Sequence, residues 1–332
     1  MILPLLAFLT LTILAYLGVD WIRRLAIRRR IVDHPNERSS HSVPTPRGGG
    51  LAIVVLVIGT VLFFGFVNGF DRQSLVYVVA GILLAWLGWQ DDVSSLSSRM
   101  RFAVQAMAVT LAMLGLGYFK SVTIPLFGEL YLGWVGIPVT FFWILGLINA
   151  YNFMDGLDGF AGGVALAAGL GWTILSSTFG GLENPLAFWI ALSIAASSLG
   201  FLGHNWPPAR IFMGDVASTF LGFSFAVLPL GHGTISPAAA GSILTIFATM
   251  FVSALKIAAP IVGAVFLTDI SLGILARTVP QLNVFVVGFP AKLAVALFAV
   301  IIVMPMAFGV MTGLFTSVHH DLLALLRNLG GG

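Results

Sequence analysis

Two carboxylates and two amides stand close together at residues 149–159, between long apolar runs. Asp155 and Asp158 are three residues apart, a spacing that would place both carboxylates on one face if the turn is helical. Asn149 and Asn152 come just before them. A packing seam would explain the neighbouring glycines but not the acids. Because such a polar cluster is costly at a membrane surface unless it binds something, we expect a binding site here.

Three further acidic residues could serve the same chemistry. Asp91 and Asp92 are adjacent at the end of an apolar run, where they repel each other and oppose the helix macrodipole. A divalent cation or a cationic substrate would offset this repulsion, whereas helix capping would explain only one of the two. Asp215 begins another apolar run and could equally be a helix N-cap. Together these residues predict carboxylates that hold Mg²⁺, or alternatively Mn²⁺, with the help of substrate phosphates.

A loop rich in proline and glycine at residues 33–50 supplies basic and imidazole groups. Arg38 and Arg47 could each form paired hydrogen bonds with phosphate oxygens, and His41 is a further candidate for substrate binding. The glycines at 48–50 would let the backbone approach a ligand or turn sharply into the next helix. We interpret the loop as a phosphate-binding element. The alternative is an arginine cluster that only sets membrane orientation, which we prefer for the arginines at 23–30.

The elements that must position these residues are membrane helices. Hydrophobic residues make up 58% of the chain, charged residues only 9%, and the mean hydropathy is +1.02, which excludes a soluble globular protein. Within a bilayer the backbone must satisfy its own hydrogen bonds, and the apolar runs are continuous rather than alternating, so helices are expected. We predict an all-α, polytopic transmembrane bundle forming one domain over residues 1–332. The absence of cysteine excludes disulfides and thiolate metal sites.

Ten apolar runs have about the length needed to cross a membrane. The amino-terminal run has no basic segment or small-residue cleavage site before Trp21, so we expect a retained first span. Residues 260–288 are ambiguous and could add an eleventh, broken or re-entrant span. The predicted spans cover residues 2–22, 50–69, 74–90, 102–119, 134–151, 160–178, 185–203, 216–231, 239–259 and 289–314.

The arginines indicate the orientation of the bundle, since cytoplasmic loops collect basic residues. Most of them fall between alternate spans, which places the amino terminus outside and five loops in the cytoplasm: 23–49, 91–101, 152–159, 204–215 and 268–280. The acids described above lie on the same side. A transporter or channel would instead carry acids near the middle of its spans, so this distribution argues against one.

Several of these segments resemble a known family. Asp91 with Asp92, residues 149–159 and residues 211–215 are similar to the signature blocks of polyprenyl-phosphate N-acetylhexosamine-1-phosphate transferases, the superfamily that includes phospho-N-acetylmuramoyl-pentapeptide transferase. The loop at 34–49 resembles the branch that initiates O-antigen or other surface glycans. The similarity covers roughly residues 30–225, and its motifs are long and in the expected order.

The resemblance implies an enzyme at the cytoplasmic face of a bacterial inner membrane. It would transfer N-acetylhexosamine 1-phosphate from a UDP-N-acetylhexosamine to polyprenyl phosphate, such as undecaprenyl phosphate, and release UMP. Membrane lipid and these two substrates are the implied partners, no nucleic acid is expected, and a homodimer is one assembly that the resemblance allows. Whether an aspartate attacks first or the lipid phosphate attacks directly stays open.

The resemblance also implies roles for the charged residues. Asp215 would bind Mg²⁺, and Asp91 would accept the proton of the lipid phosphate with support from Asp92. Asp155 would contribute to the metal shell and, together with Asp158, would hold the nucleotide.

The implied roles extend to polar and aromatic residues. Asn149 and Asn152 would help to hold the nucleotide and the metal shell. Asn205 and Phe212 would form the uracil pocket, with Phe212 stacked on the ring.

The chain departs from the family pattern at two places. The last cytoplasmic loop of the family carries basic residues and a histidine motif after an aspartate like Asp269. In this chain, residues 270–281 contain one basic residue, Arg277, and no histidine. Ala217 replaces a glycine and would add a methyl group close to the implied metal site. The alternative to an active enzyme is therefore a relative that binds nucleotide sugar or lipid phosphate with weak or no turnover.

Overall fold

The computed structural model describes residues 2–29, 32–33, 44–94, 96–124, 128–156, 158–179, 185–231, 260, 263–275, 277, 288 and 290–305. The chain forms two compact units, which are described separately. The first contains residues 1–122 and 129–235, and the second contains residues 123–128 and 236–332.

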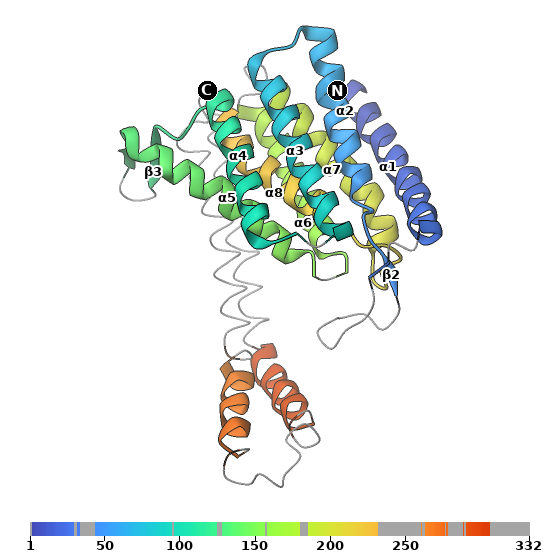
Figure 1. Ribbon diagram of the computed structural model, residues 1–332, viewed down its shortest axis with the longest axis vertical. Coiled ribbons are helices and arrows are strands. Elements are labelled where there is room, and N and C mark those ends of the chain that lie inside the picture. Colours follow the sequence, from blue (N-terminus) through green and yellow to red (C-terminus); the bar gives the residue numbers. More distant parts are fainter. Residues whose placement is uncertain are drawn as a thin grey trace. The chain divides into compact units, whose positions relative to one another are not determined.

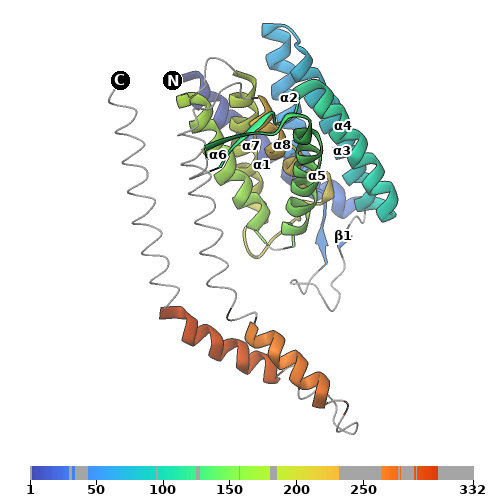
Figure 2. The ribbon, with the colours of Figure 1, turned by 90° about the vertical axis from the view of Figure 1, so that its left-hand side faces the viewer.

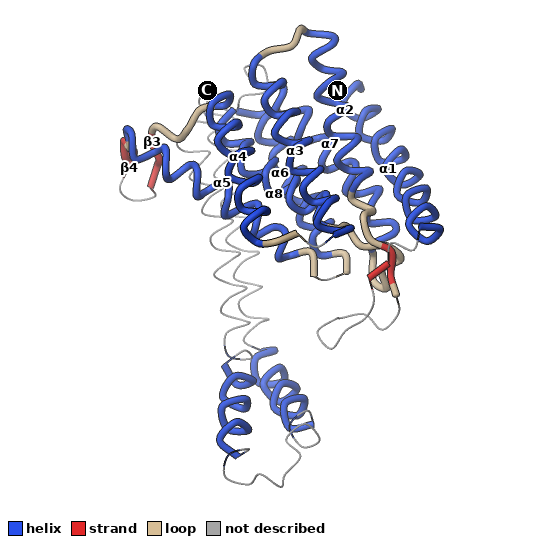
Figure 3. Tube along the Cα trace, in the orientation of Figure 1, coloured by secondary structure: helices blue, strands red, loops and turns tan. Residues whose placement is uncertain are grey.

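Helices dominate the described residues, as the apolar runs predict. The helices of the first unit are α1 (Ile2–Arg29), α2 (Leu51–Asn68), α3 (Arg72–Ser94), α4 (Ser98–Leu116), α5 (Gly136–Met154), α6 (Phe160–Phe179), α7 (Pro185–Asn205) and α8 (Asp215–Val227), with short 3₁₀ turns η1 (Gly133–Val135) and η2 (Leu228–Gly231) (Figure 1). Two small strand pairs join β1 (Val32–Asp33) to β2 (Thr45–Pro46) and β3 (Ser121–Ile124) to β4 (Gly128–Tyr131) (Figure 3). The predicted all-α class is confirmed.

Seven helices in the described part of the chain are long and apolar enough to cross a membrane: α1 to α4, η1 with α5, α6 and α7. Three shorter apolar helices cover Asp215–Leu230, Gly263–Leu275 and Pro290–Pro305. The predicted span at 239–259 lies outside the described residues, so the total of ten or eleven spans stays a prediction. In the second unit, Asp269 and Lys292 form an ion pair between the two shorter helices.

Two predicted spans are parts of longer helices, and one predicted loop is partly helical. We placed the end of the first span at residue 22, but α1 continues to Arg29, and Asp20 forms ion pairs with Arg23 and Arg24 one turn later. Similarly, α3 continues to Ser94 and carries Asp91 and Asp92 on its last turn. The predicted loop at 268–280 is helical up to Leu275. An apolar run ends where the side chains leave the hydrocarbon of the membrane. The helix can continue into water because the residues that follow are good helix formers.

The buried centre of the first unit is α8, whose residues from Val216 to Val227 are all buried (Figures 1 and 2). It packs against α3 and α5, and glycines permit close approach on both sides. A Cβ atom at Gly88 of α3 would lie 2.3 Å from the Asp215 carbonyl oxygen, and one at Gly222 would lie 2.6 Å from the carbonyl oxygen of Leu147 on α5. This packing brings the first turn of α8 against the last turn of α3.

Candidate active site

The segment at residues 209–216, which leads into α8, is held by three carboxylates from other parts of the chain. They accept its backbone N–H groups as follows: Asp158 from Ala209 (2.9 Å), Asp155 from Gly214 (3.0 Å), and Asp92 from Asp215 (3.1 Å) and Val216 (3.3 Å). Gly214 has a φ of +81°, and a Cβ atom there would lie 2.6 Å from Asp92 Oδ2. Only glycine therefore fits this turn without strain.

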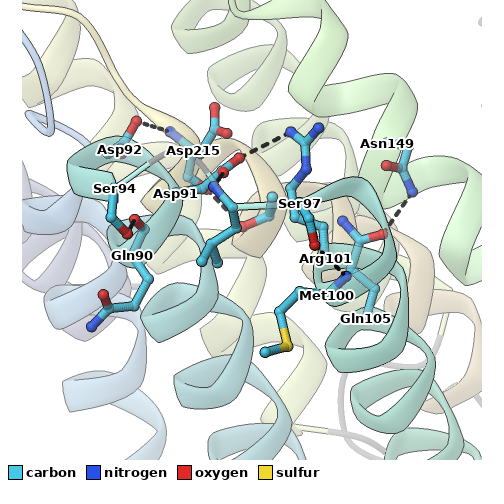
Figure 4. A network of polar contacts seen from close by, with 12 residues as sticks. Gln90, Asp91, Asp92, Ser94, Ser97, Met100, Arg101, Gln105, Asn149 and Asp215 are labelled. Atoms are coloured by element: carbon cyan, nitrogen blue, oxygen red, sulfur yellow. Dashed lines mark hydrogen bonds and ion pairs between the residues drawn. The ribbon is translucent and has the colours of Figure 1, made fainter.

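A cavity of about 570 Å³ lies beside this segment, between α3, α4, α5 and α8. Its lining combines polar groups with apolar side chains such as Leu87, Phe142 and Leu145. The polar lining consists of Asp91, Ser98, Arg101, Gln105, Asn149, Asn152, Asp215 and Thr219, several of which are drawn in Figure 4. Asp92, Asp155 and Asp158 are not part of the lining. The predicted acids therefore divide into a pair that faces the cavity and three that hold the backbone.

The cavity pair is held by neighbouring polar groups. Asp91 Oδ2 lies 2.9 Å from Arg101 Nη1, and Asp91 Oδ1 accepts the Leu96 N–H at 2.6 Å. The Asp215 carboxyl group lies close enough to Asp91 and to the Asn152 side chain for both to affect its pKa. The Asp91 side chain is only 8% exposed, whereas Arg101 is 44% exposed. Arg101 is therefore the solvent-exposed partner of this ion pair.

A hydrogen bond links α4 and α5 across the cavity wall. Asn149 Nδ2 donates to Gln105 Oε1 at 3.0 Å (Figure 4). It also donates to the Leu145 carbonyl oxygen at 2.8 Å. Asn149 is therefore oriented by two acceptors, and Gln105 is fixed beside it.

Negative charge exceeds positive charge at this end of the bundle. Burial raises the pKa of Asp155 to about 8, and the nearby carboxylates of Asp215 and Asp92 act in the same direction. Burial also raises the pKa of Asp215 to about 7, with Asp92 and Asp91 adding to the effect. Arg47 Nη1, 3.9 Å from Asp92 Oδ1, offsets part of this charge. A bound cation would offset the repulsion between these carboxylates and would favour their ionised forms over the protonated ones.

The described residues contain no group of three or more His, Cys, Asp or Glu side chains arranged to hold a metal ion by themselves. Mg²⁺, however, is usually bound by one or two carboxylates together with substrate phosphates and water. Asp91 and Asp215, which lie close together and face the cavity, match this donor set, and Asn152 adds an amide beside them. The site thus fits Mg²⁺ that is held jointly by the protein and a diphosphate.

Asn205, predicted in a uracil pocket, is 3% exposed and joins two loops. Its Oδ1 accepts the Gly159 N–H at 2.9 Å, and its Nδ2 donates to the Ile211 carbonyl oxygen at 3.0 Å. Phe212 is half-buried, and its backbone N–H donates to the Pro46 carbonyl oxygen at 2.8 Å. The structure thus gives Asn205 a part in holding the loops together, and its contact with uracil stays a prediction.

Gly49 and Gly50 pack against the chain itself, so the close approach that we expected of them is to backbone, whereas phosphate binding by the loop stays a prediction. Gly49 N–H donates to the Phe212 carbonyl oxygen (2.9 Å) and Gly50 N–H to the Met213 carbonyl oxygen (3.0 Å). A Cβ atom at Gly50 would lie 2.2 Å from the Cβ atom of Ala217. Ala217 is fully buried in this contact, so its methyl group faces Gly50. The predicted sharp turn into α2 is confirmed.

Two predicted substrate-binding residues, Arg38 and His41, lie outside the described residues. Four polar residues of the cavity lining were not among our predicted site residues, namely Ser98, Arg101, Gln105 and Thr219. Arg101 and Gln105 are four residues apart at the start of an apolar helix, and Thr219 follows Asp215 by four residues. The sequence signal for these residues is their spacing. Residues four apart on a helix share a face, so a polar residue one turn from a charged residue at a helix end is expected to line the same site.

The fold and the site together define a polytopic membrane protein with a carboxylate-rich cavity at one end of its helical bundle. The family model described as glycosyl transferase family 4 matches residues 74–232, which include the whole cavity lining. The decaprenyl-phosphate N-acetylglucosaminephosphotransferase of Mycolicibacterium smegmatis is 36% identical over 288 residues, which cover 81% of this chain and 69% of the relative. The chain belongs to glycosyl transferase family 4.

Other relatives align over shorter regions. The probable undecaprenyl-phosphate N-acetylglucosaminyl 1-phosphate transferase of Bacillus subtilis is 37% identical over 211 residues, 63% of this chain and 57% of the relative. The undecaprenyl-phosphate alpha-N-acetylglucosaminyl 1-phosphate transferase of Escherichia coli K12 is 32% identical over 213 residues, 61% of this chain and 55% of the relative. A second family model, bacterial export proteins, family 1, matches residues 215–318. This match covers under half of the chain and does not show membership.

Proposed function

We propose that the protein transfers N-acetylhexosamine 1-phosphate from a UDP-N-acetylhexosamine to a polyprenyl phosphate, releases UMP and requires Mg²⁺. One observation carries the proposal: within the family domain, a single cavity joins two carboxylates suited to Mg²⁺ to an apolar lining inside a membrane bundle. A reaction between a water-soluble diphosphate and a lipid phosphate needs both kinds of surface in one place.

The groups of the cavity suit the two substrates. Arg101 is the exposed cation at the polar end and would bind phosphate oxygens. Asp91 and Asp215 would hold Mg²⁺ against the diphosphate. Asn152 would donate a hydrogen bond to the nucleotide sugar, and Asn149, whose Nδ2 already donates to Gln105 and Leu145, would accept one through its Oδ1. Leu87, Phe142 and Leu145 would contact the isoprenoid chain near its phosphate.

The reaction requires positioning more than a strong nucleophile. An oxygen of the lipid phosphate attacks the sugar-bearing phosphorus of the donor, the bond from that phosphorus to the bridging oxygen breaks, and UMP leaves. Asp91 would take the proton of a monoprotonated lipid phosphate. Bound Mg²⁺ would neutralise charge on the diphosphate, while Arg101 and the asparagines align the two phosphates.

The site end of the bundle would face the cytoplasm of a bacterial inner membrane. α1 ends on this side with Arg28 and Arg29 in its last turn, and β2 leads from there to Arg47 beside Asp92. Arginines concentrate on the cytoplasmic side of membrane proteins. UDP-sugars are supplied in that compartment, which agrees with the proposed donor.

Purified protein mixed with undecaprenyl phosphate, UDP-N-acetylglucosamine or UDP-N-acetylgalactosamine, and Mg²⁺ tests the proposal. We expect a lipid-linked sugar and an equal amount of UMP from at least one donor, and no product in EDTA. Asp91→Asn and Asp215→Asn should each lower kcat by about 100-fold or more. Asp71→Asn is the matched control, because Asp71 caps α3 through Ser74 at the opposite end of the same helix.

Each part of the proposal can fail separately. If no donor gives product, the proposed activity is wrong, and donor binding without product would support the relative that lacks turnover. If Asp91→Asn, Asp215→Asn and the control Asp71→Asn all have the kcat of wild type, the assignment of the cavity as the active site is wrong.

A further inference from the structure

The first turn of α8 is capped by a side chain that does not belong to α8. The residue at the N-cap position is Gly214, which has no side chain to offer the free N–H groups of the helix. Asp92, on the last turn of α3, accepts two of these groups, one at each carboxylate oxygen: Asp215 N–H at 3.1 Å and Val216 N–H at 3.3 Å. A carboxylate at this place also interacts favourably with the helix dipole.

The surroundings of Asp92 leave it little access to a substrate. Its side chain is 3% exposed and does not line the cavity, whereas its neighbour Asp91 does. The only ion pair recorded for Asp92 among the described residues is the contact of 3.9 Å with Arg47. Asp91 and Asp92 are thus adjacent in sequence but face different parts of the protein.

The cap acts on the backbone of the residue that matters for the cavity. The N–H group that Asp92 Oδ1 accepts belongs to Asp215 itself. On the other side of this turn, Gly88 brings the α3 backbone so close that a Cβ atom would lie 2.3 Å from the Asp215 carbonyl oxygen. The Asp215 backbone is therefore fixed by α3 at both its N–H and its carbonyl group.

We propose that Asp92 is a positioning residue, which caps α8 from the end of α3 and so sets the place of the Asp215 carboxylate in the cavity. Asp91 contacts the reacting groups, and Asp92 acts on them only through Asp215. The effect on catalysis rests on the proposed function, but the capping does not.

Hydrogen–deuterium exchange in detergent tests the capping without any need for turnover. In Asp92→Ala, we expect the amides of Asp215 and Val216 to exchange about tenfold faster than in wild type. Asp92→Asn keeps the size of the side chain and one acceptor oxygen, so its exchange should be intermediate. Asp91→Asn is the matched control, because it removes a neighbouring charge but no hydrogen bond to the α8 backbone, and the amides of Asp215 and Val216 should exchange as in wild type. Wild-type exchange in Asp92→Ala would overturn the inference, whether or not the protein makes product.

Activity measurements separate positioning from direct chemistry. A positioning role predicts that kcat falls as the amides of Asp215 and Val216 exchange faster. The kcat of Asp92→Ala should be about tenfold below that of wild type, and the kcat of Asp92→Asn should lie between the two. The Mg²⁺ concentration for half-maximal activity should rise in both variants, an effect that a loss of stability alone would not produce. Asp92→Asn that exchanges like wild type but is as inactive as Asp91→Asn would show a direct chemical role and overturn the inference.

Discussion

The contact between Gly50 and α8 couples helix packing to the site, and Gly50→Ala tests this coupling. A Cβ atom at Gly50 would lie 2.2 Å from Ala217 Cβ, 2.8 Å from Met213 Cγ and 2.9 Å from the Met213 carbonyl oxygen. Carbon atoms in contact stand about 3.5–4.0 Å apart. Either α2 or the first turn of α8 must therefore move by about 1.3 Å or more.

This movement should reduce both stability and activity. Overpacking of a buried contact costs roughly 1–3 kcal/mol. Because Met213 and Ala217 flank Asp215, a shift of the turn also displaces the cavity carboxylate, and a displacement of about 1 Å can lower a catalytic rate by on the order of 100-fold. We therefore expect a lower melting temperature and a much larger loss of kcat than the loss of stability would suggest.

Thermal unfolding in detergent and the rate of lipid-linked sugar formation measure the two effects. Gly59→Ala on the same helix is the control, because a Cβ atom there has no neighbour within 4 Å. Adding Ala217→Gly to Gly50→Ala removes the closest clash but leaves the two with Met213, so partial recovery is expected. If Gly50→Ala behaves like Gly59→Ala, or if Ala217→Gly restores nothing, the reasoning about this contact is refuted.

Two further predictions concern the charges of the site. Arg101→Ala removes the guanidinium group that pairs with Asp91 and lies 44% exposed, so the KM for polyprenyl phosphate should rise about tenfold or more, with Arg101→Lys intermediate; an unchanged KM in initial-rate measurements would contradict this. The raised pKa of Asp155, about 8, means that the folded protein binds more protons than the unfolded chain between pH 4 and 8. Without divalent cations, the melting temperature should therefore fall as the pH rises through this range, and Mg²⁺ should stabilise the protein most at pH 8. A melting temperature in EDTA that rises with pH would oppose this explanation.

The membrane helices could be predicted from the sequence because each apolar run is continuous and bounded by charged or turn residues. Their ends could not. Hydropathy marks where a side chain leaves the hydrocarbon, while the backbone continues to form helical hydrogen bonds, as it does through Arg29 in α1 and Ser94 in α3. The error matters at Asp91 and Asp92, which we placed in a loop and which are in fact fixed on a helix.

The composition of the site could also be predicted, since the ends of α3, α5 and α7 and the start of α8 were expected on one side of the membrane. What each carboxylate contacts could not be read from the sequence. Asp91 and Asp92 have the same chemistry, and a helix turns them about 100° apart, so only the packing of α8 on α3 decides which one faces the cavity. Gly49 and Gly50 hydrogen-bond to backbone, and Asn205 also holds backbone while its predicted contact with uracil stays a prediction, because a motif does not show whether a polar group meets substrate or backbone.

The division among the carboxylates has a consequence for Mg²⁺ binding. Asp155 accepts the N–H of Gly214, and Asp92 accepts the N–H groups of the two residues that follow Gly214. Both carboxylates also lie close to Asp215, since Asp92 raises the pKa of Asp215 and Asp215 raises the pKa of Asp155. The charges that fix the loop are therefore the same charges that make the cavity attractive to a cation. Neutralising either residue should loosen the turn and weaken cation binding together, whereas neutralising Asp158, which holds only the start of the segment at Ala209, should loosen the segment with little effect on the cation. The two side chains that hold the turn would thus also contribute to the Mg²⁺ affinity that we propose for the cavity.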